Sequence, residues 1–172
     1  MKLLKWVQFT WDLADIADRS AELPKHYTIT PAGAADEMAL RKVLSTSFLL
    51  DPAWNPAVGQ VMQTIQGRID AALATESQTF LALRHGARII GAALLQLDPA
   101  LGENLAIGPA IYSEYRNRGF GTLLLNASLV WLRDAGVTRA TAIAPDYVPV
   151  TRFLYPKFGS SAQPLPGALL AA

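Results

Sequence analysis

The chain has 172 residues, of which 51% are hydrophobic and 17% charged, and its formal net charge is +1. This composition excludes extensive disorder, and the scattered basic residues form no dense run that could follow a nucleic-acid backbone. The absence of cysteine excludes disulfides, thiolate nucleophiles and cysteine-bound zinc. The length fits a single domain over residues 1–172, and no apolar run reaches the ~20 residues of a membrane helix. We therefore expect a cytoplasmic protein that binds neither nucleic acid nor membrane.

Apolar and polar side chains alternate near the N-terminus, which is the period of a half-buried strand. The apolar set consists of Val7, Phe9, Trp11 and Leu13. The charged residues 15–25 that follow are expected to form a loop or a short helix. We predict an N-terminal extension with an extra strand over residues 1–25, and a core over residues 26–160 that opens with a short strand from Tyr27 to Pro31.

Two segments then carry apolar residues at helical spacing. In the first, one face is formed by Leu40, Val43, Leu44 and Phe48. In the second, Asn55 is the expected cap, Pro56 is the first helical residue, and the apolar stripe extends to Leu73. Both stripes are interpreted as surfaces buried in the core.

The second half of the core alternates between strands and helices. Three strand-like runs cover residues 79–84, 89–97 and 104–112, the first two forming a hairpin. A helix that ends near Gly136, a buried strand over residues 140–144 and a helical piece over residues 150–155 follow. This order predicts an α/β fold of the α+β kind, with helices on the faces of a central mixed sheet in three layers.

The segment from Tyr115 to Thr122 places two glycines between a strand-like run and a helical run. The first N–H groups of a helix have no partner within it, and the helix dipole is positive at that end, so a phosphate can accept several bonds there. Gly119 and Gly121 carry no Cβ, which lets an anion approach the backbone and permits dihedrals closed to other residues. The segment predicts a pyrophosphate site, and a simple turn is the alternative interpretation.

The sequence from Ile111 to Thr122 resembles the acyl-CoA signature of the GCN5-related N-acetyltransferase (GNAT) family, Val-x-Pro-x-x-Arg-x-x-Gly-x-Gly, with Ser113 in place of the proline. The resemblance implies that backbone amides of the loop hold the CoA pyrophosphate and that residues 111–113 pair with the pantetheine arm. The implied cofactor-binding residues are Ile111, Tyr112, Ser113, Arg116, Asn117, Arg118, Gly119, Phe120, Gly121 and Thr122. Either arginine could instead be a solvated surface residue.

A second stretch, Phe153 to Gly159, is similar to the family's Leu-Tyr-x-x-x-Gly-Phe. The resemblance implies that Tyr155 is catalytic and donates a proton to the leaving CoA thiolate. The alternative is a tyrosine that fills space in the core. Val148 stands where the family often has asparagine, Ser160 replaces an aromatic residue, and Pro156 is expected to tilt or end the helix.

Only thirteen residues follow Gly159, which is too few for the two closing strands that the family normally has. We expect the N-terminal strand, Val7 to Leu13, to supply the missing pairing, either within the chain or across a dimer, because an open apolar edge invites aggregation. A homodimer through the N-terminal arm or the open sheet edge is a further hypothesis.

The function implied by the resemblance is N-acetyltransferase activity, in which acetyl-CoA is the cosubstrate and a primary amine of a small molecule or protein is the acceptor. No metal is expected, because His26 and His85 lie too far apart in the sequence to suggest a pair. Glu103 and Glu114 are the nearest carboxylates to a general base, and neither is assigned. Two alternatives remain open: a regulatory module that binds acyl-CoA without turnover, and a structural protein whose apolar N-terminal arm docks on a partner.

Overall fold

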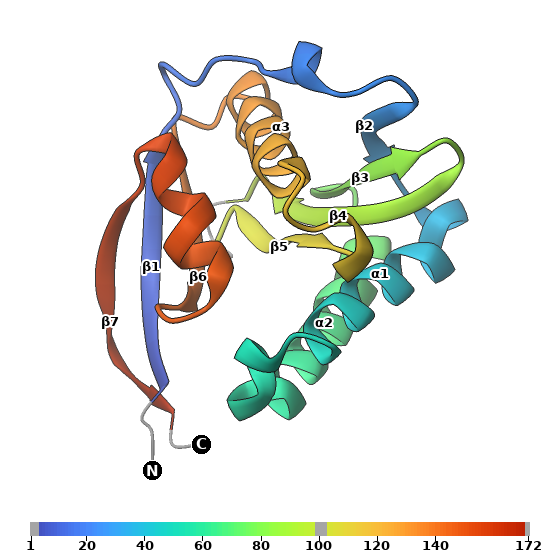
Figure 1. Ribbon diagram of the computed structural model, residues 1–172. Helices are drawn as coiled ribbons and strands as arrows, with labels where there is room; N and C mark the ends of the chain where they lie inside the picture. The colour runs from blue at the N-terminus through green and yellow to red at the C-terminus, as the bar shows by residue number, and fades with distance from the viewer. Residues whose placement is uncertain (1–3, 99–102, 171–172) are drawn as a thin grey trace.

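The computed structural model describes residues 4–98 and 103–170, whose elements are shown in Figure 1. The strands are β1 (Leu4–Asp12), β2 (Tyr27–Ala32), β3 (Gln78–His85), β4 (Arg88–Gln96), β5 (Leu105–Ile111), β6 (Arg139–Pro145) and β7 (Ser161–Leu170). The α-helices are α1 (Glu37–Leu49), α2 (Val58–Leu73) and α3 (Phe120–Asp134). The predicted strand and helix types are confirmed for these elements, and the last helical piece differs in detail. None of the helices described is long and apolar enough to cross a membrane.

The strands form two antiparallel sheets. The larger has the order β2-β3-β4-β5 and the smaller has the order β6-β1-β7. They meet where β5 and β6 begin, because the Asn104 amide donates to the Thr141 carbonyl (2.9 Å) and the Asn104 side-chain oxygen accepts from the Thr141 amide (3.1 Å). The predicted α+β fold is confirmed, with its central sheet divided between β5 and β6.

Helices cover both faces of the larger sheet. Successive side chains of a strand point to opposite faces, and the neighbours Ala82 and Leu83 in β3 are both fully buried. Helices α1, α2 and α3 all pack against this sheet, and α3 lies in a different layer from α1 and α2 (Figure 1). The apolar stripes of α1 and α2 enter the core as predicted, through residues such as Leu44 and Ile69.

Helix α2 begins at Val58, two residues later than Asn55 and Pro56 predict. Both residues belong to a separate 3-10 segment, Pro52–Ala57, whose start is capped by the Asp51 side chain accepting from the Ala53 amide (3.0 Å). The residue whose side chain caps this segment is therefore Asp51 and not Asn55, and the connection between α1 and α2 is a structured turn.

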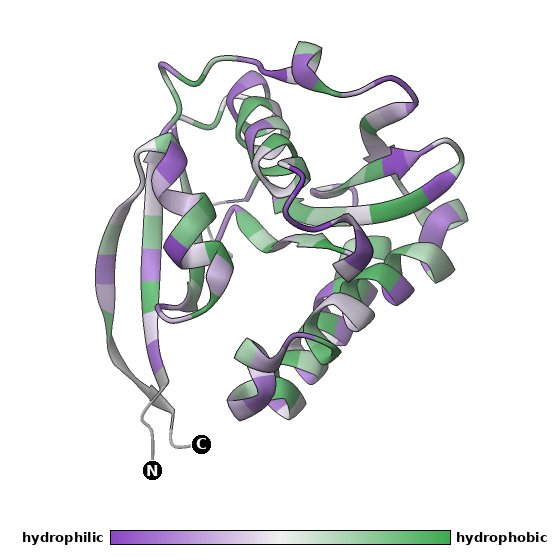
Figure 2. Cartoon of the chain, viewed as in Figure 1, coloured by the Kyte–Doolittle hydropathy of each residue, from purple (hydrophilic) through white to green (hydrophobic). Residues whose placement is uncertain are grey.

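The N-terminal strand pairs within the chain, which is the first of the two predicted alternatives. Phe9 lies opposite Ala142 of β6 on one side and Ala162 of β7 on the other, so both edges of β1 are occupied. One strand, β7, follows Gly159, and it lies at the edge of its sheet, a position that tolerates the prolines of this segment. Alternating hydropathy is visible along β1 in Figure 2. Formation of a homodimer stays a prediction.

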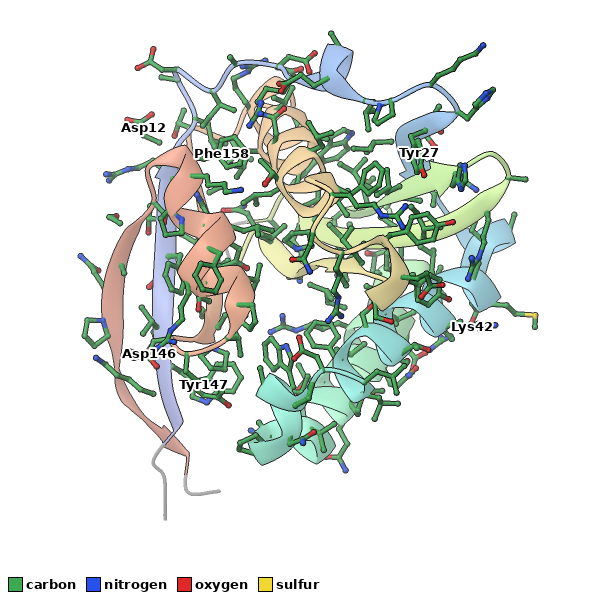
Figure 3. All side chains as sticks on the ribbon, in the orientation of Figure 1. Asp12, Tyr27, Lys42, Asp146, Tyr147 and Phe158 are labelled. Carbon is green, nitrogen blue, oxygen red and sulfur yellow. The ribbon has the colours of Figure 1, made fainter. Side chains whose placement is uncertain are left out.

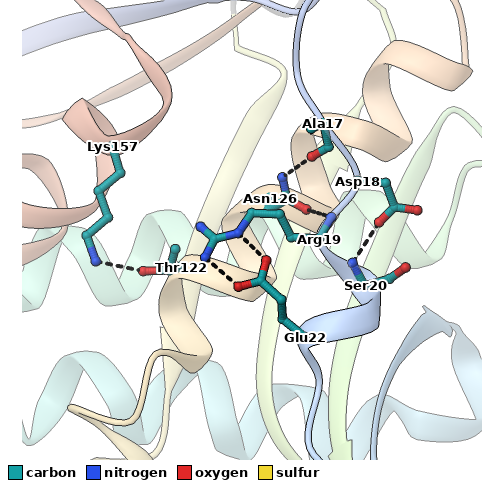
Figure 4. A network of polar contacts seen from close by, with 8 residues as sticks. All are labelled: Ala17, Asp18, Arg19, Ser20, Glu22, Thr122, Asn126 and Lys157. Carbon is teal, nitrogen blue, oxygen red and sulfur yellow. Dashed lines mark hydrogen bonds and ion pairs between the residues drawn. The ribbon is translucent and has the colours of Figure 1, made fainter.

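The segment between β1 and β2 is fastened to the outside of α3. Asn126, nearly fully buried, donates to the Ala17 carbonyl (2.8 Å) and accepts from the Arg19 amide (2.9 Å), as Figure 4 shows. Arg133 also donates to the Ile16 carbonyl. These bonds connect β1 to the helix that follows the glycine loop.

Candidate active site

A cleft of about 790 Å³ lies where the two sheets separate. Its floor is β5, and its walls come from the α1–α2 connection, the start of α3, the end of β6 and the segment around Tyr155. Side chains project into the region between the two halves, and Asp146 and Tyr147 lie on the smaller half toward α2 (Figure 3). The cleft therefore brings both predicted motifs to one site.

The structure brings most of the predicted site residues together. The cleft is lined by Ile111, Arg116, Asn117, Gly119, Gly121, Thr122 and Tyr155. The remaining four predicted residues, Tyr112, Ser113, Arg118 and Phe120, are not part of its lining. Helix α3 begins at Phe120, so the loop delivers the start of a helix to the cleft as its sequence predicts.

The two glycines have different structural roles. Gly119 takes a left-handed conformation (φ 83°), and a Cβ added there would meet nothing within 4 Å. Gly121 is helical, and a Cβ there would come within 2.9 Å of the Leu154 side chain. The expectation that both glycines need special dihedrals is thus wrong for Gly121, which permits close packing of α3 against the segment that carries Tyr155.

Arg116 fastens the loop to α1. Its guanidinium donates to the carbonyls of Ser47 (2.9 Å) and Ile111 (3.0 Å) and pairs with the Asp51 carboxylate at 3.4 Å. These contacts satisfy much of its hydrogen-bonding capacity within the protein. Arg118 differs, because its guanidinium lies over the Tyr115 ring (5.5 Å) at the surface.

Tyr112, Ser113 and Phe120 support the loop from outside the cleft. The Tyr112 amide donates to the Ile90 carbonyl (2.9 Å), so it is occupied in the β4–β5 pairing and is not free to bind a ligand. Because successive amides of a strand point to opposite edges, the Ile111 amide faces the cleft. Phe120 is buried against Tyr27 (4.5 Å between ring centroids), and exposed Ser113 begins a 3-10 turn.

Tyr155 lines the cleft, and 3% of its surface is exposed. Its hydroxyl donates to the Gly108 carbonyl of β5 (3.2 Å), so the phenol of the smaller half reaches the strand of the larger half. The predicted helix is here a π-helical turn, Val150–Leu154, followed by a 3-10 turn, Tyr155–Phe158. Pro156 lacks the N–H that an α-helix would need, yet Tyr155 remains in the cleft.

Strand β1 surrounds the Tyr155 ring. Phe9 and Trp11 contact it edge to face, with centroids at 5.0 and 4.8 Å, and the Trp11 indole N–H donates to the Tyr155 carbonyl (3.2 Å). Burial is the main cause that raises the pKa of the phenol, and the Glu103 carboxylate adds to the rise. The phenol therefore stays protonated at neutral pH. The alternation of β1 indicated burial of Phe9 and Trp11, but no sequence signal connected them to Tyr155.

One carboxylate of the cleft lining comes from Glu103, which is 8% exposed. It accepts from Arg68 of α2 (2.7 Å) and from the Ile143 amide of β6 (3.2 Å), and Arg68 also donates to the Ala106 carbonyl. Glu114, the other carboxylate considered as a base, is more than half exposed and pairs with Arg88 at 3.2 Å, outside the cleft lining. Glu103 is therefore the better placed of the two.

Lys157 is a cleft residue that the sequence interpretation missed. Its ammonium donates to the Thr122 hydroxyl (2.9 Å) at the first turn of α3, as seen in Figure 4. A positive charge beside free helix N–H groups makes a more favourable site for phosphate than the amides alone. The position two residues after Tyr155 was the available signal, because the segment packs against the loop.

Comparisons with known proteins give a consistent family and fold. A model of the Acetyltransferase (GNAT) family matches residues 41–159. A putative GNAT acetyltransferase from Novosphingobium aromaticivorans has a TM-score of 0.59 at 16% identity, with 95% of this chain and 61% of that chain covered. A GCN5-related N-acetyltransferase from Sphaerobacter thermophilus has a TM-score of 0.62 at 16% identity, with 95% and 50% covered.

A functionally unknown conserved protein from Staphylococcus epidermidis has a TM-score of 0.63 at 11% identity, with 95% of this chain and 59% of that chain covered. At such identities these three similarities concern the fold alone. The chain spans about half to three fifths of the length of these solved structures. The search of curated proteins finds no match.

Proposed function

Because the chain belongs to the acetyltransferase (GNAT) family, we propose that it transfers the acetyl group of acetyl-CoA directly to a primary amine. The observation that carries this proposal is the cleft at the split between β5 and β6. Its lining contains both a helix start suited to phosphate and a buried, protonated phenol. Without such a split, the thioester could not pass between the two sheets to reach an amine on the other side.

The cofactor would bind along the loop and the open edge of β5. The amides of residues 117–122 have no backbone partner among the described residues, so they are available for pyrophosphate. Lys157 adds a positive charge to this wall. On β5, the carbonyls of Ala106, Gly108 and Ile111 each accept a hydrogen bond from a side chain in the cleft. The Ile111 amide points to the same edge of the strand and can donate toward the split.

The chemistry would need no covalent enzyme intermediate. A neutral amine attacks the thioester carbon, and the Ile111 amide stabilises the oxyanion of the tetrahedral intermediate. The amine proton passes to Glu103, directly or through water, and the carbon–sulfur bond breaks as the intermediate collapses. Tyr155 donates its hydroxyl proton to the leaving thiolate and is then reprotonated from solvent.

Tyr155 is suited to donate and poorly suited to act as a base. The rise in its pKa keeps the proton on the oxygen, and its reach to Gly108 places it beside the strand along which the thioester would lie. The same rise makes it a weaker acid, so we expect a moderate contribution to the rate. A module that binds acyl-CoA without turnover would share this geometry and would be recognised by the absence of product.

The test is calorimetric titration of acetyl-CoA and CoA into the protein and its Gly119 variants. Gly119→Asn and Gly119→Asp are matched in size, and both residues tolerate the left-handed conformation, so they differ mainly in charge. Gly86→Asp, at a remote left-handed turn (φ 58°), is the control for added charge. We expect micromolar binding that Gly119→Asp weakens far more than Gly119→Asn, with Gly86→Asp unchanged. A folded protein without CoA binding would overturn the proposal.

A further inference from the structure

The far end of the cleft, beyond Tyr155, has a composition that restricts the acceptor. We define the acceptor end as the part of the lining contributed by Trp6, Phe48, Trp54, Thr64, Arg68 and Glu103. Its residues come from β1, from the end of α1, from the connection between α1 and α2, from α2 and from the segment just before β5. The inference below rests on the proposed acetyl transfer and concerns the class of amine.

Both carboxylates of the cleft are already paired. Glu103 forms its salt bridge with Arg68 at 2.7 Å, and Asp51 forms one with Arg116 at 3.4 Å. With Lys157, the lining carries three basic side chains and two acidic ones. A polycationic acceptor would place a second ammonium where no unpaired carboxylate of the described lining could neutralise it, and burying such a charge is expensive.

The rim of the smaller half repeats this pattern. Asp146, which lies on the side toward α2, pairs with Lys5 at 3.9 Å (Figure 3). Asp146 is not part of the cleft lining, so the argument against a polycation rests on the paired carboxylates within the cleft. The charge distribution disfavours polyamines and lysine-rich peptides as acceptors.

Aromatic rings form much of the acceptor end. The rings of Phe48 and Trp54 pack edge to face, with centroids 4.8 Å apart, and this contact holds the α1–α2 connection against the end of α1. Phe153, 65% exposed, lies at the rim on the side of the cleft that carries Tyr155. Such walls favour an aromatic or apolar body, whose burial is the main source of affinity in a mostly apolar pocket.

Trp6 adds one unmet hydrogen-bond donor. Its indole N–H is buried and has no partner within the described part of the chain. Side chains alternate along β1, so Trp6 lies on the face opposite Phe9 and Trp11, which hold the Tyr155 ring. Trp6 also lines the cleft, so its indole ring lies on the acceptor side of the smaller sheet, and leaving its donor unpaired beside an apolar ligand would be unfavourable.

We infer that the acceptor is a primary amine on an uncharged aromatic or apolar body that carries one hydrogen-bond-accepting oxygen, with the body against Phe48 and Trp54 and the oxygen accepting from the Trp6 indole. The rings, the paired carboxylates and the unmet donor each restrict a different part of this molecule.

The test uses two probe amines of nearly equal shape. N-(2-aminoethyl)benzamide has the oxygen, 4-phenylbutylamine lacks it, and spermidine represents the polycations. Acetyl transfer is measured for all three, and binding of each to the protein saturated with CoA is measured by ligand-observed NMR. The variants are Trp6→Phe, which removes the N–H and keeps a ring, and Trp131→Phe, on α3 outside the cleft lining, as the matched control.

We expect the benzamide to be the best of the three substrates, and Trp6→Phe to raise its KM about five- to tenfold while leaving 4-phenylbutylamine and CoA affinity unchanged. Trp131→Phe should alter none of these values. The inference is overturned if spermidine is preferred, if the two aromatic amines are equal in the wild type, or if neither binds while CoA does. Absence of CoA binding would instead overturn the proposed function itself.

Discussion

The two halves of the central sheet are built in different ways. In the larger half, β3 and β4 are neighbours in the sequence and form a hairpin, and β5 adds to β4 as the next strand of the chain. In the smaller half, β1 from one end of the chain lies between β6 and β7 from the other end. The larger half can form from local contacts, whereas the smaller half requires the two ends of the chain to meet.

This difference matters because the site uses both halves. The larger half and its loop supply the Ile111 amide and the helix start, and the smaller half supplies Tyr155, held by Phe9 and Trp11. The relative placement of the Ile111 amide and the Tyr155 phenol, which we propose as oxyanion donor and acid, therefore depends on a strand far from both in the sequence. Five experiments test how the site depends on each half.

Removing β1 should have the largest effect. Deletion of residues 1–25 would leave β6 and β7 without their shared partner and would expose the Tyr155 ring. We expect aggregation and loss of the cooperative thermal transition, because unpaired strand edges associate. Light scattering and thermal denaturation would measure this. An equally soluble and equally stable truncated protein would show that the smaller half does not depend on β1.

Tyr155→Phe tests the contribution of the smaller half to chemistry. It removes the hydroxyl that bonds to Gly108 and retains the ring between Phe9 and Trp11. We expect kcat to fall ~100-fold, at the lower end of general acid effects, with little change in CoA affinity. Steady-state kinetics and calorimetry separate the two quantities. An unchanged kcat would leave Tyr155 as a packing residue.

Arg116→Met tests the attachment of the loop to the larger half. The substitution leaves the carbonyls of Ser47 and Ile111 without their donor and Asp51 without its cation. Because these groups are partly buried, we expect a loss of ~2 kcal/mol in the free energy of unfolding. Arg118→Met, at an exposed position over Tyr115, is the control and should change it by less than ~0.5 kcal/mol. Equal effects in urea denaturation would contradict the assigned role of Arg116.

Alkaline pH should weaken the smaller half through the phenol. Burial raises the pKa of Tyr155, so the folded protein keeps a proton that the unfolded chain releases above about pH 10. Its contribution to stability is therefore full below that pH and is lost as the pH rises further. Above about pH 10, we expect the wild type to lose up to ~1.4 kcal/mol per pH unit relative to Tyr155→Phe. Parallel pH profiles in urea denaturation would argue against a buried phenol.

Lys157→Met should have the smallest effect. It removes a charge beside Thr122 at the start of α3 without disturbing the loop backbone. We expect CoA affinity to fall about fivefold, and less at high salt, because an exposed charge is screened. Lys157→Arg should preserve most of the affinity. Calorimetry with CoA at two salt concentrations measures both effects, and an unchanged affinity in Lys157→Met would exclude the contact with phosphate.

Most of the elements and the position of the loop could be predicted from the sequence. Apolar periodicity located the strands and the two core helices because burial of one face sets the spacing of apolar residues. The run through Gly119 to a helix start predicted the loop because helix termini and left-handed turns have local chemical requirements. The alternation of Val7, Phe9, Trp11 and Leu13 also predicted β1, which pairs with β6 and β7.

Which polar groups of the loop and cleft are left free depends on the tertiary structure. Arg116, which lines the cleft, donates to the carbonyls of Ser47 and Ile111, and the Tyr112 amide donates to the Ile90 carbonyl. The contacts of Tyr155 with Trp11 and of Lys157 with Thr122 join residues far apart in the chain. Local patterns reflect burial and backbone requirements, whereas the partner of a polar side chain depends on what packing brings within about 3 Å of it. That distance is set by the whole fold.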